Sequence, residues 1–337
     1  MASSAQSNKS QFVLGIESSC DDASASVLRI SDGEVFSNII SSQVKTHAPY
    51  GGVVPELASR QHFKNIPLVV DMALEKAGIT LDNIAFICAT SSPGLIGSLL
   101  VGLSYGKALA FSKKLPFLEV HHIEAHMMAV HLENRVNYPY IALVVSGGHT
   151  HLFLVRDFGD YDLLGGTMDD AAGEAFDKVA KFFNLGFPGG PLVDKLAQQG
   201  NPKSYSFPRP FLNEDNFKFS FSGLKTAVIQ WAKKNPQVQL EDVLASFQEA
   251  IVDVLVEKTK RASLKYNCQN IVVCGGVACN SRLRVVMKEM CERFNLNFYI
   301  PTPLLCTDNA AMVAYTGLQS WMRGRVSSDI LGTTCGS

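Results

Sequence analysis

The chain holds four histidines between positions 121 and 131, and two of them have a spacing that suits a metal ion. His122 and His126 lie four residues apart in a run without proline or glycine, which favours an α-helix. At this spacing two imidazoles lie on the same face of a helix and offer two nitrogen ligands to one cation. A third ligand has to come from elsewhere, because His121 and His131 project in other directions.

The same stretch argues against a zinc protease. The protease motif His-Glu-x-x-His places its glutamate directly after the first histidine, where it serves as the general base. Here Glu124 comes two positions after His122, which turns it about 200° around the helix. The glutamate therefore does not reach a water on the same ion. Two histidines at this spacing also occur in proteins that bind no metal.

Length and charge narrow the class of protein. A chain of 337 residues with 47% hydrophobic and 18% charged residues is typical of a globular protein with two domains. Its net charge of −1 gives no overall basic field, so any nucleic acid would have to meet a local patch. One basic cluster consists of Lys258, Lys260, Arg261 and Lys265. It is either such a patch or a solvated helix face.

Eight scattered cysteines without a Cys-x-x-Cys pair favour reduced thiols over a disulfide framework. Residues 1–10 are small and polar and are expected to form a disordered tail. No run approaches the roughly eighteen apolar residues of a membrane-spanning helix, so we expect a cytoplasmic protein with no membrane segment. The cysteines are Cys20, Cys88, Cys268, Cys274, Cys279, Cys291, Cys306 and Cys335.

Two pairs of segments repeat the same design. Residues 11–30 and 140–156 each have the pattern of a β-hairpin with small polar residues at its tip. Residues 83–110 and 270–294 each have the pattern of a strand, a glycine-bearing turn and a helix. A mostly helical stretch, about 171–264, separates the second hairpin from the second strand-turn-helix segment. The repeat predicts an α/β fold with two related lobes.

The glycine-bearing turns predict an anion site. Glycines let backbone N–H groups approach an anion closely, and a helix N-terminus favours negative charge. Two hairpin tips and the Gly275-Gly276 turn would cradle a nucleotide between the lobes, although such turns also have a purely structural interpretation. The pattern is neither a Walker sequence nor a Rossmann fingerprint. Asp177 and Asp194 flank the turn at 186–191 and are candidate acceptors for sugar hydroxyls, or else solvated helix residues.

Ordered motifs along nearly the whole chain carry a family resemblance. The chain resembles the universal tRNA threonylcarbamoyladenosine transferases, in a bacterial-type form, within the superfamily of actin, the heat-shock chaperone ATPases and the sugar kinases. The motifs are GIESSCDD (15–22), GGVVPELASR (51–60), PGLIGSLLVG (93–102), HHIEAH (121–126), VSGGHT (145–150), GEAFDK (173–178), FPGGP (187–191), FSFSGLK (219–225), GGVACN (275–280) and CTDNAA (306–311).

The resemblance implies the fold of that superfamily, which is α/β with two lobes, duplicated mixed β-sheets and helical insertions. It places an N-terminal lobe at residues 11–122 plus about 307–337. It places a C-terminal lobe at residues 123–306, with a helical insertion at about 165–265.

The resemblance also implies a metal held by His122, His126 and Asp308, one ion per subunit, with iron(II) as the first expectation and zinc as the second. From the sequence alone, Asp308 also has the position of a helix cap. Glu17 is the candidate catalytic residue, either a proton acceptor or an orienting group. The implied substrate-binding residues are Val144, Val145, Ser146, Gly147, Gly148, Asp177, Gly190, Asp194 and Asn280.

The implied reaction moves a threonylcarbamoyl group from threonylcarbamoyl-AMP to the N6 amine of adenosine at position 37 of tRNAs that read codons beginning with A, and releases AMP. The implied partners are tRNA, a paralogous dimerising subunit and a small ATPase of the bacterial complex. Two other functions are compatible with the sequence. One is a non-catalytic actin-like ATPase scaffold, and the other is a zinc metallopeptidase, a label that the family once carried.

Overall fold

The computed structural model describes residues 11–325 of the chain. Within them the backbone divides into two compact units. Residues 11–133 and 308–325 form the first unit, and residues 134–307 form the second. This division differs from the predicted one, which ended the first segment at residue 122.

Helix α4 (His122–Met128) and the 3₁₀ turn η3 (Ala129–Leu132) account for the different boundary. Both pack against α11 (Ala310–Met322), which belongs to the first unit. The chain therefore leaves this unit only after Glu133, once that packing is complete. The predicted tail at residues 1–10 lies outside the described part of the chain.

The first unit contains a mixed sheet in the order β3-β2-β1-β4-β5. Its first three strands form an antiparallel meander, whereas β4 runs parallel to β1 and β5 runs parallel to β4. The predicted hairpin over residues 11–30 is confirmed, and the strand that begins the predicted segment 83–110 is β4. The strands are β1 (Phe12–Glu17), β2 (Asp22–Arg29), β3 (Val35–Ser42), β4 (Ile84–Ser92) and β5 (Phe117–His121).

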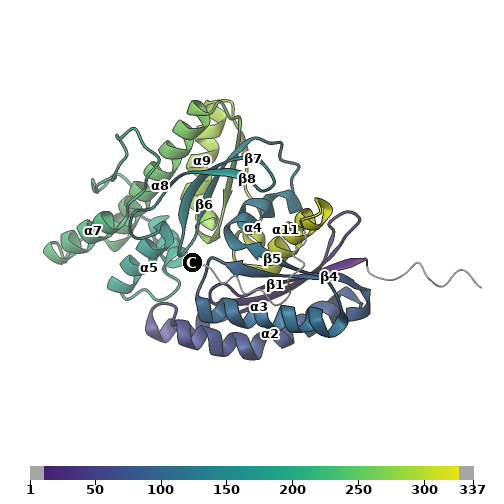
Figure 1. Cartoon of the computed structure of the whole chain (residues 1–337). Coiled ribbons are helices and arrows are strands. Elements are labelled where there is room, and N and C mark those ends of the chain that lie inside the picture. Colours follow the sequence, from purple (N-terminus) through teal and green to yellow (C-terminus); the bar gives the residue numbers. More distant parts are fainter. Residues whose placement is uncertain (1–10, 326–337) are drawn as a thin grey trace, which may run out of the picture. The chain divides into compact units, whose positions relative to one another are not determined.

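Helices cover both faces of this sheet. The long helices α2 and α3 pack against each other and against the strands on one face, beneath the sheet in Figure 1. On the other face α11 contacts all five strands and α4 packs beside it. The helical elements that precede α4 are α1 (Val44–His47), η1 (Ala48–Tyr50), α2 (Pro55–Ala77), η2 (Leu81–Asn83) and α3 (Ile96–Lys113).

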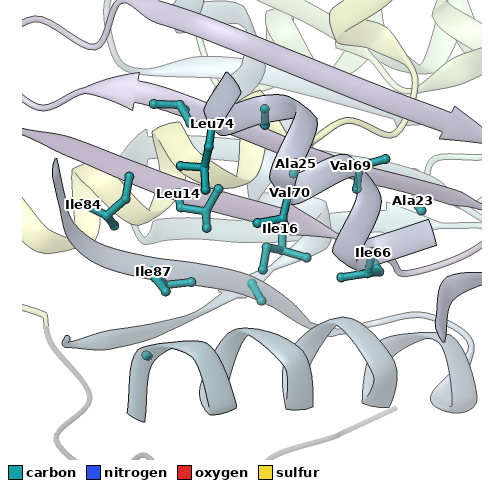
Figure 2. Packing of buried hydrophobic residues seen from close by; sticks show 14 of the residues in the cluster. Leu14, Ile16, Ala23, Ala25, Ile66, Val69, Val70, Leu74, Ile84 and Ile87 are labelled. Carbon is teal, nitrogen blue, oxygen red and sulfur yellow. The ribbon is translucent and has the colours of Figure 1, made fainter. Parts of the chain in front are cut away.

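Alternation along β1 sends its side chains to both helical layers. Leu14 and Ile16 pack with Val69 and Val70 of α2 in the apolar cluster shown in Figure 2. Gly15 lies between them in the chain and faces α11 instead. Successive residues of a strand point to opposite faces of the sheet. Because both faces are covered, the strand is apolar from Phe12 to Ile16 rather than alternating with polar residues.

Gly15 allows α11 to lie directly on the sheet. A Cβ atom at this position would lie 2.7 Å from the carbonyl oxygen of Ala310 and 2.7 Å from the backbone nitrogen of Ala314. Backbone atoms at this range cannot rotate away, so any side chain here has to displace the helix. The start of α11 is also held by Ser24, whose buried hydroxyl accepts a 2.9 Å hydrogen bond from the backbone N–H of Ala310. Strands β1 and β2 together determine where α11 begins.

The second unit repeats the topology of the first sheet. Its order is β10-β9-β6-β7-β8, with an antiparallel meander followed by two strands that run parallel to β6. In both sheets the first strand of the meander lies beside the fourth strand of the unit, which confirms the predicted duplication. The strands are β6 (Tyr140–Val145), β7 (Thr150–Asp157), β8 (Asp160–Gly166), β9 (Asn270–Cys274) and β10 (Asn297–Tyr299).

Along the chain, helices α5 to α8 come after β8 and before β9. The longest, α8, packs on α6 and α9 and contacts β6 and β9. Its buried apolar residues include Val243, Leu244, Phe247, Ile251, Val254 and Leu255. No helix within residues 11–325 is long and apolar enough to cross a membrane. The helical elements are α5 (Ala172–Phe182), α6 (Gly189–Ala197), α7 (Ser222–Lys234), α8 (Leu240–Lys265), η4 (Gly276–Cys279), α9 (Ser281–Arg293) and α10 (Pro303–Cys306).

We predict that Gly15→Ala lowers the free energy of unfolding by about 1–3 kcal/mol, because the added methyl group overpacks the contact between β1 and α11. Denaturant unfolding followed by circular dichroism measures the change. Gly52→Ala is the matched control, since a Cβ atom at Gly52 meets nothing within 4 Å. An equal effect of the two substitutions would contradict the close approach of α11.

Candidate metal centre and ligand pocket

Three side chains of the first unit converge on one point. His122 begins α4, His126 lies one turn later, and Asp308 lies two residues before α11. Nε2 of His126 is 3.1 Å from Oδ1 of Asp308, and Nε2 of His122 is 3.7 Å from the same oxygen. The rings of the two histidines meet edge to face with centroids 4.6 Å apart. The predicted helix is present, and the three candidate ligand atoms lie within 4.8 Å of one another.

These separations suit a shared cation. Metal bonds of about 2.1 Å place neighbouring nitrogen and oxygen ligands about 3.0–3.4 Å apart, a range that includes the 3.1 Å separation of His126 and Asp308 and that the 3.7 Å separation of His122 and Asp308 slightly exceeds. The side chains of His122 and His126 are buried, whereas 23% of the Asp308 side chain is exposed. The three residues can therefore hold an ion from one side and leave further coordination positions for a ligand.

The buried carboxylate of Glu17 lies behind His122. Its Oε2 is 3.1 Å from Nδ1 of His122 and accepts a 2.7 Å hydrogen bond from the hydroxyl of Thr90. Its Oε1 accepts a 2.5 Å hydrogen bond from the backbone N–H of Ser19. A carboxylate on Nδ1 fixes the tautomer of a ligating histidine and directs its Nε2 toward a metal. These contacts favour an orienting role for Glu17 over that of a proton acceptor.

Strand order explains why these groups meet. β1, β4 and β5 are parallel neighbours, so their carboxyl ends lie at one edge of the sheet. Glu17 ends β1, Thr90 lies near the end of β4, and His122 directly follows β5. Ligands of α/β sheets bind at the carboxyl ends of the strands for the same reason. The local topology of the first unit thus gathers the histidine and its supporting groups.

Asp308 reaches the site because another residue caps α11. The N-cap is Asn309, whose side-chain oxygen accepts a 3.1 Å hydrogen bond from the backbone N–H of Met312. The alternative interpretation of Asp308 as a helix cap is therefore wrong. Its carboxylate contacts His126 and His122 instead.

Buried negative charge surrounds the three side chains. Burial and the charge of Asp308 raise the pKa of Asp22 to about 7, and burial also raises the pKa of Asp21. Burial disfavours protonation of His122, but the charges of Glu17 and Asp308 outweigh it and raise its pKa to about 9. A bound cation would offset this negative charge without protonating the groups. Donor chemistry and electrostatics both fit a divalent ion.

A pocket of about 350 Å³ lies within the second unit. Its lining includes Gly173 in the first turn of α5, Gly190 in the first turn of α6 and Asn280 at the N-cap of α9. The first turn of a helix presents backbone N–H groups without helical partners and a partial positive charge. Three such turns around one pocket favour an anionic ligand.

The pocket brings together part of the predicted substrate-binding set. The predicted residues that line it are Gly147, Asp177, Gly190, Asp194 and Asn280. Val144 and Val145 do not line it, because they are fully buried in the interior strand β6. Ser146 and Gly148 belong to the turn that follows and are also outside the lining.

Hydrogen bonds within the chain already engage the polar side chains of this set. Oδ1 of Asp177 accepts a 2.7 Å bond from the backbone N–H of Gly189. Asp194 accepts bonds from the backbone N–H and the hydroxyl of Ser281, at 3.0 and 2.8 Å. Asn280 caps α9 through its side-chain oxygen. These groups hold the helix starts in place, so a sugar hydroxyl would have to share the two carboxylates with them.

Sequence reasoning missed several contributors. Ser19 and Thr90 support Glu17, and Cys279 and Thr307 line the pocket. The carboxyl-end rule for parallel strands would have identified Thr90, which follows the strand of the predicted strand-turn-helix segment 83–110. No local signal marks Thr307, because its place in the lining depends on tertiary packing.

The basic cluster on α8 is not a continuous patch. Lys258 is fully buried, and its ammonium donates a 2.5 Å hydrogen bond to the backbone oxygen of Asn216. Lys260 and Arg261 both pair with Glu257. The nucleic-acid interpretation is wrong for Lys258, because the helix turns that residue toward the protein interior.

Comparison with known proteins decides the family. Residues 34–315 match the family described as tRNA N6-adenosine threonylcarbamoyltransferase. The chain belongs to this family. Relatives of that name from Geotalea daltonii and Geobacter sulfurreducens are 52% and 53% identical to it over 310 residues, which is 91% of the chain and 91% of each relative. The threonylcarbamoyltransferase family assignment does not favour the metallopeptidase or the ATPase scaffold.

A solved structure confirms the predicted fold class of this threonylcarbamoyltransferase-family chain. Component A of the (R)-2-hydroxyglutaryl-CoA dehydratase of Acidaminococcus fermentans superposes with a TM-score of 0.57 at 14% identity. The match covers 92% of this chain and 99% of that one. The fold is the α/β fold of the actin and sugar-kinase superfamily, with a mixed five-stranded sheet in each unit.

We predict that Asp194→Ala lowers the free energy of unfolding by about 1–3 kcal/mol without any ligand, because both bonds to Ser281 at the start of α9 are lost. Thermal and denaturant unfolding measure the change. Lys195→Ala is the matched control, since this exposed neighbour also lines the pocket. If Asp194→Ala left stability unchanged, the positioning role would be refuted.

Proposed function

We propose that this chain transfers a threonylcarbamoyl group from threonylcarbamoyl-AMP to the N6 amine of the adenosine beside a tRNA anticodon. Family membership over most of the chain supports the reaction class. The observation that carries the proposal is the meeting of three helix N-termini in one pocket of the second unit. An acyl-adenylate has a phosphate that such a site favours, and about 350 Å³ lies within the size range of small-molecule sites.

The same pocket accounts for how the chain would assist the reaction. The adenosine amine attacks the carbamoyl carbon, a C–N bond forms, the amine nitrogen releases one proton to water, and the bond from that carbon to the phosphate oxygen breaks. Negative charge gathers on the phosphate of the departing AMP. The first turns of α5 and α6 contribute Gly173 and Gly190 to the pocket lining, and the partial positive charge of these helix starts would stabilise the departing phosphate. The acyl group arrives activated, and the step requires no ATP hydrolysis.

We also propose that His122, His126 and Asp308 hold one divalent ion per subunit, iron(II) in the first place and zinc in the second. Two imidazoles and one carboxylate with further positions open are a donor set of non-haem iron(II) enzymes and of some zinc sites. Such an ion, when bound, would supply Lewis-acid polarisation of an oxygen that it coordinates. Glu17 keeps Nδ1 of His122 hydrogen-bonded, so that its Nε2 is presented as a ligand.

A groove on the first unit is a candidate binding surface for a protein partner. Phe63 and Pro67 of α2 and Leu100, Val101 and Tyr105 of α3 line it. The Phe63 side chain is 76% exposed. Neighbouring exposed apolar side chains mark protein interaction surfaces. We assign this groove to the paralogous dimerising subunit, with the small ATPase and tRNA as the other partners of the complex.

We predict a graded loss of metal along the series Glu17→Gln and His126→Ala. The first removes the charge that orients His122 and weakens metal affinity about 10–100-fold. The second removes a ligand and abolishes stoichiometric binding. Elemental analysis after anaerobic loading with iron(II) or zinc measures the metal content, and circular dichroism verifies the fold.

The matched control for metal binding is His121→Asn. His121 accepts a hydrogen bond from the backbone N–H of Glu124 at the start of α4, and asparagine preserves such a cap. This variant is expected to keep its metal. A full metal complement in His126→Ala would show that the ion is held elsewhere.

We predict that the chain forms threonylcarbamoyladenosine in tRNA when it is given threonylcarbamoyl-AMP, tRNA and its metal. Mass spectrometry of the nucleosides, with and without the two partner proteins, measures the product.

Gly190→Leu is expected to raise KM for the adenylate about tenfold or more, because a Cβ at Gly190 meets nothing within 4 Å and the new side chain fills the pocket.

Gly223→Leu is the matched control for Gly190→Leu. Gly223 is likewise the second residue of a helix, is exposed and has open space around its Cβ position. Rapid ATP turnover without any modified nucleoside would instead favour the actin-like scaffold. Cleavage of a peptide with added zinc would favour the metallopeptidase.

A further inference from the structure

Two consecutive residues of α8 hold the start of α9. Oε1 of Gln248 accepts a 2.7 Å hydrogen bond from Nδ2 of Asn280, the N-cap of α9. The carboxylate of Glu249 accepts bonds of 2.6 and 2.7 Å from the guanidinium of Arg282, in the first turn of the same helix. The two contacts differ in their relation to the ligand pocket, because Asn280 lines it and Arg282 does not.

The hydrogen bond between Gln248 and Asn280 is shielded from water. Only 4% of Gln248 and 8% of Asn280 is exposed. Glutamine is found mostly on protein surfaces, and a buried amide that lacks a partner destabilises the fold. In this pair the oxygen of one buried amide accepts from the nitrogen of the other. A change at Gln248 therefore removes the acceptor of the Asn280 NH2 group.

Two hydrogen bonds fix the orientation of the Asn280 amide. Its Oδ1 accepts a 2.9 Å bond from the backbone N–H of Leu283, and its Nδ2 donates to Gln248. Rotating the amide by half a turn would lose both bonds, because the oxygen cannot donate and the nitrogen cannot accept. Nδ2 carries two hydrogens, and the second has no acceptor among residues 11–325. A hydrogen-bond donor thus remains in the pocket lining.

We propose that Gln248 is a positioning residue for the ligand pocket. By accepting one hydrogen of the Asn280 amide, it leaves the second hydrogen oriented to donate to an acceptor atom of a bound nucleotide. The partial positive charge at the start of α9 favours the same electron-rich groups. Gln248 acts through Asn280, because it is not itself among the lining residues. The nucleotide as ligand rests on the proposed function, whereas the orientation of Asn280 does not.

Loss of the Gln248 acceptor would release the NH2 group of Asn280. The bond from Leu283 would then be the remaining restraint on the amide, and it holds the oxygen rather than the nitrogen. A donor that has to be oriented when the ligand binds contributes less to affinity than one that is already in place. The expected cost is about tenfold in the dissociation constant of AMP, which is roughly the contribution of one hydrogen bond.

A double-mutant cycle tests whether the two residues act together. The four proteins are the full wild-type chain, Gln248→Met, Asn280→Ser and the double variant. Methionine fills a similar space without an amide oxygen, and serine keeps a cap for α9 but has no NH2 group. Isothermal titration calorimetry measures the dissociation constant of AMP for each protein, and circular dichroism verifies the fold.

Gln248→Met and Asn280→Ser are each expected to weaken AMP binding about tenfold, and the double variant is expected to bind no more weakly than Asn280→Ser. Glu249→Gln is the matched control and is expected to stay within about twofold of the wild type, because its partly exposed ion pair with Arg282 does not involve Asn280. Unchanged AMP binding in Gln248→Met overturns the proposal. So does an equal loss with and without the Asn280 amide.

The stabilities of the same four proteins test the orientation of Asn280 without any ligand. Denaturant unfolding is expected to show that the two substitutions are coupled by about two- to tenfold in the folding equilibrium constant. Additive effects would overturn the contact between the two amides. A wild-type chain that does not bind AMP counts against the proposed function and the positioning role together. AMP binding without coupling through Asn280 counts against the positioning role alone.

Discussion

The contact between α11 and β1 determines whether the first unit can hold a cation. Asp308 lies just before this helix, and its carboxylate reaches the two histidines only if the helix begins where it does. Gly15 permits the approach because it has no side chain, and Ser24 fixes the first N–H group of the helix. A shift of α11 by about 1 Å would be large compared with the precision that metal coordination requires. Packing of a strand against a helix is thus the origin of the ligand geometry.

The charges that the contact between α11 and β1 brings together favour a bound cation. Glu17, Asp22 and Asp308 lie near one another in a largely buried region, where carboxylates are costly to ionise without a compensating charge. The opposite charge of His122 keeps the pKa of Glu17 low despite its burial, while the pKa of Asp22 rises to about 7. The first unit therefore carries a charge distribution that a divalent ion would balance, and Glu17 can orient a histidine without itself taking part in proton transfer.

The structure could be predicted from the sequence where the signal is local. Both hairpins, both strand-turn-helix segments and the helix with His122 and His126 follow from the spacing of apolar, glycine and histidine residues. Interactions between distant segments were not predictable in this way. Asp308 meets the histidines through α11, and Lys258 is buried because the segment containing Asn216 covers it. The residue pattern of α8 alone does not show which of its basic side chains is enclosed.

The duplicated hairpins show why a repeated pattern does not predict a repeated role. In the first, the backbone oxygen of Ser19 accepts a 2.8 Å hydrogen bond from Leu95, and the turn is packed against the start of α3. In the second, Cβ atoms at Gly147 and Gly148 would meet nothing within 4 Å, and Gly147 lines the pocket. The same strand-turn-strand geometry supports a buried carboxylate in one unit and lines an open pocket in the other. The segment packed against each turn therefore decides its chemistry, and that packing depends on residues far away in the sequence.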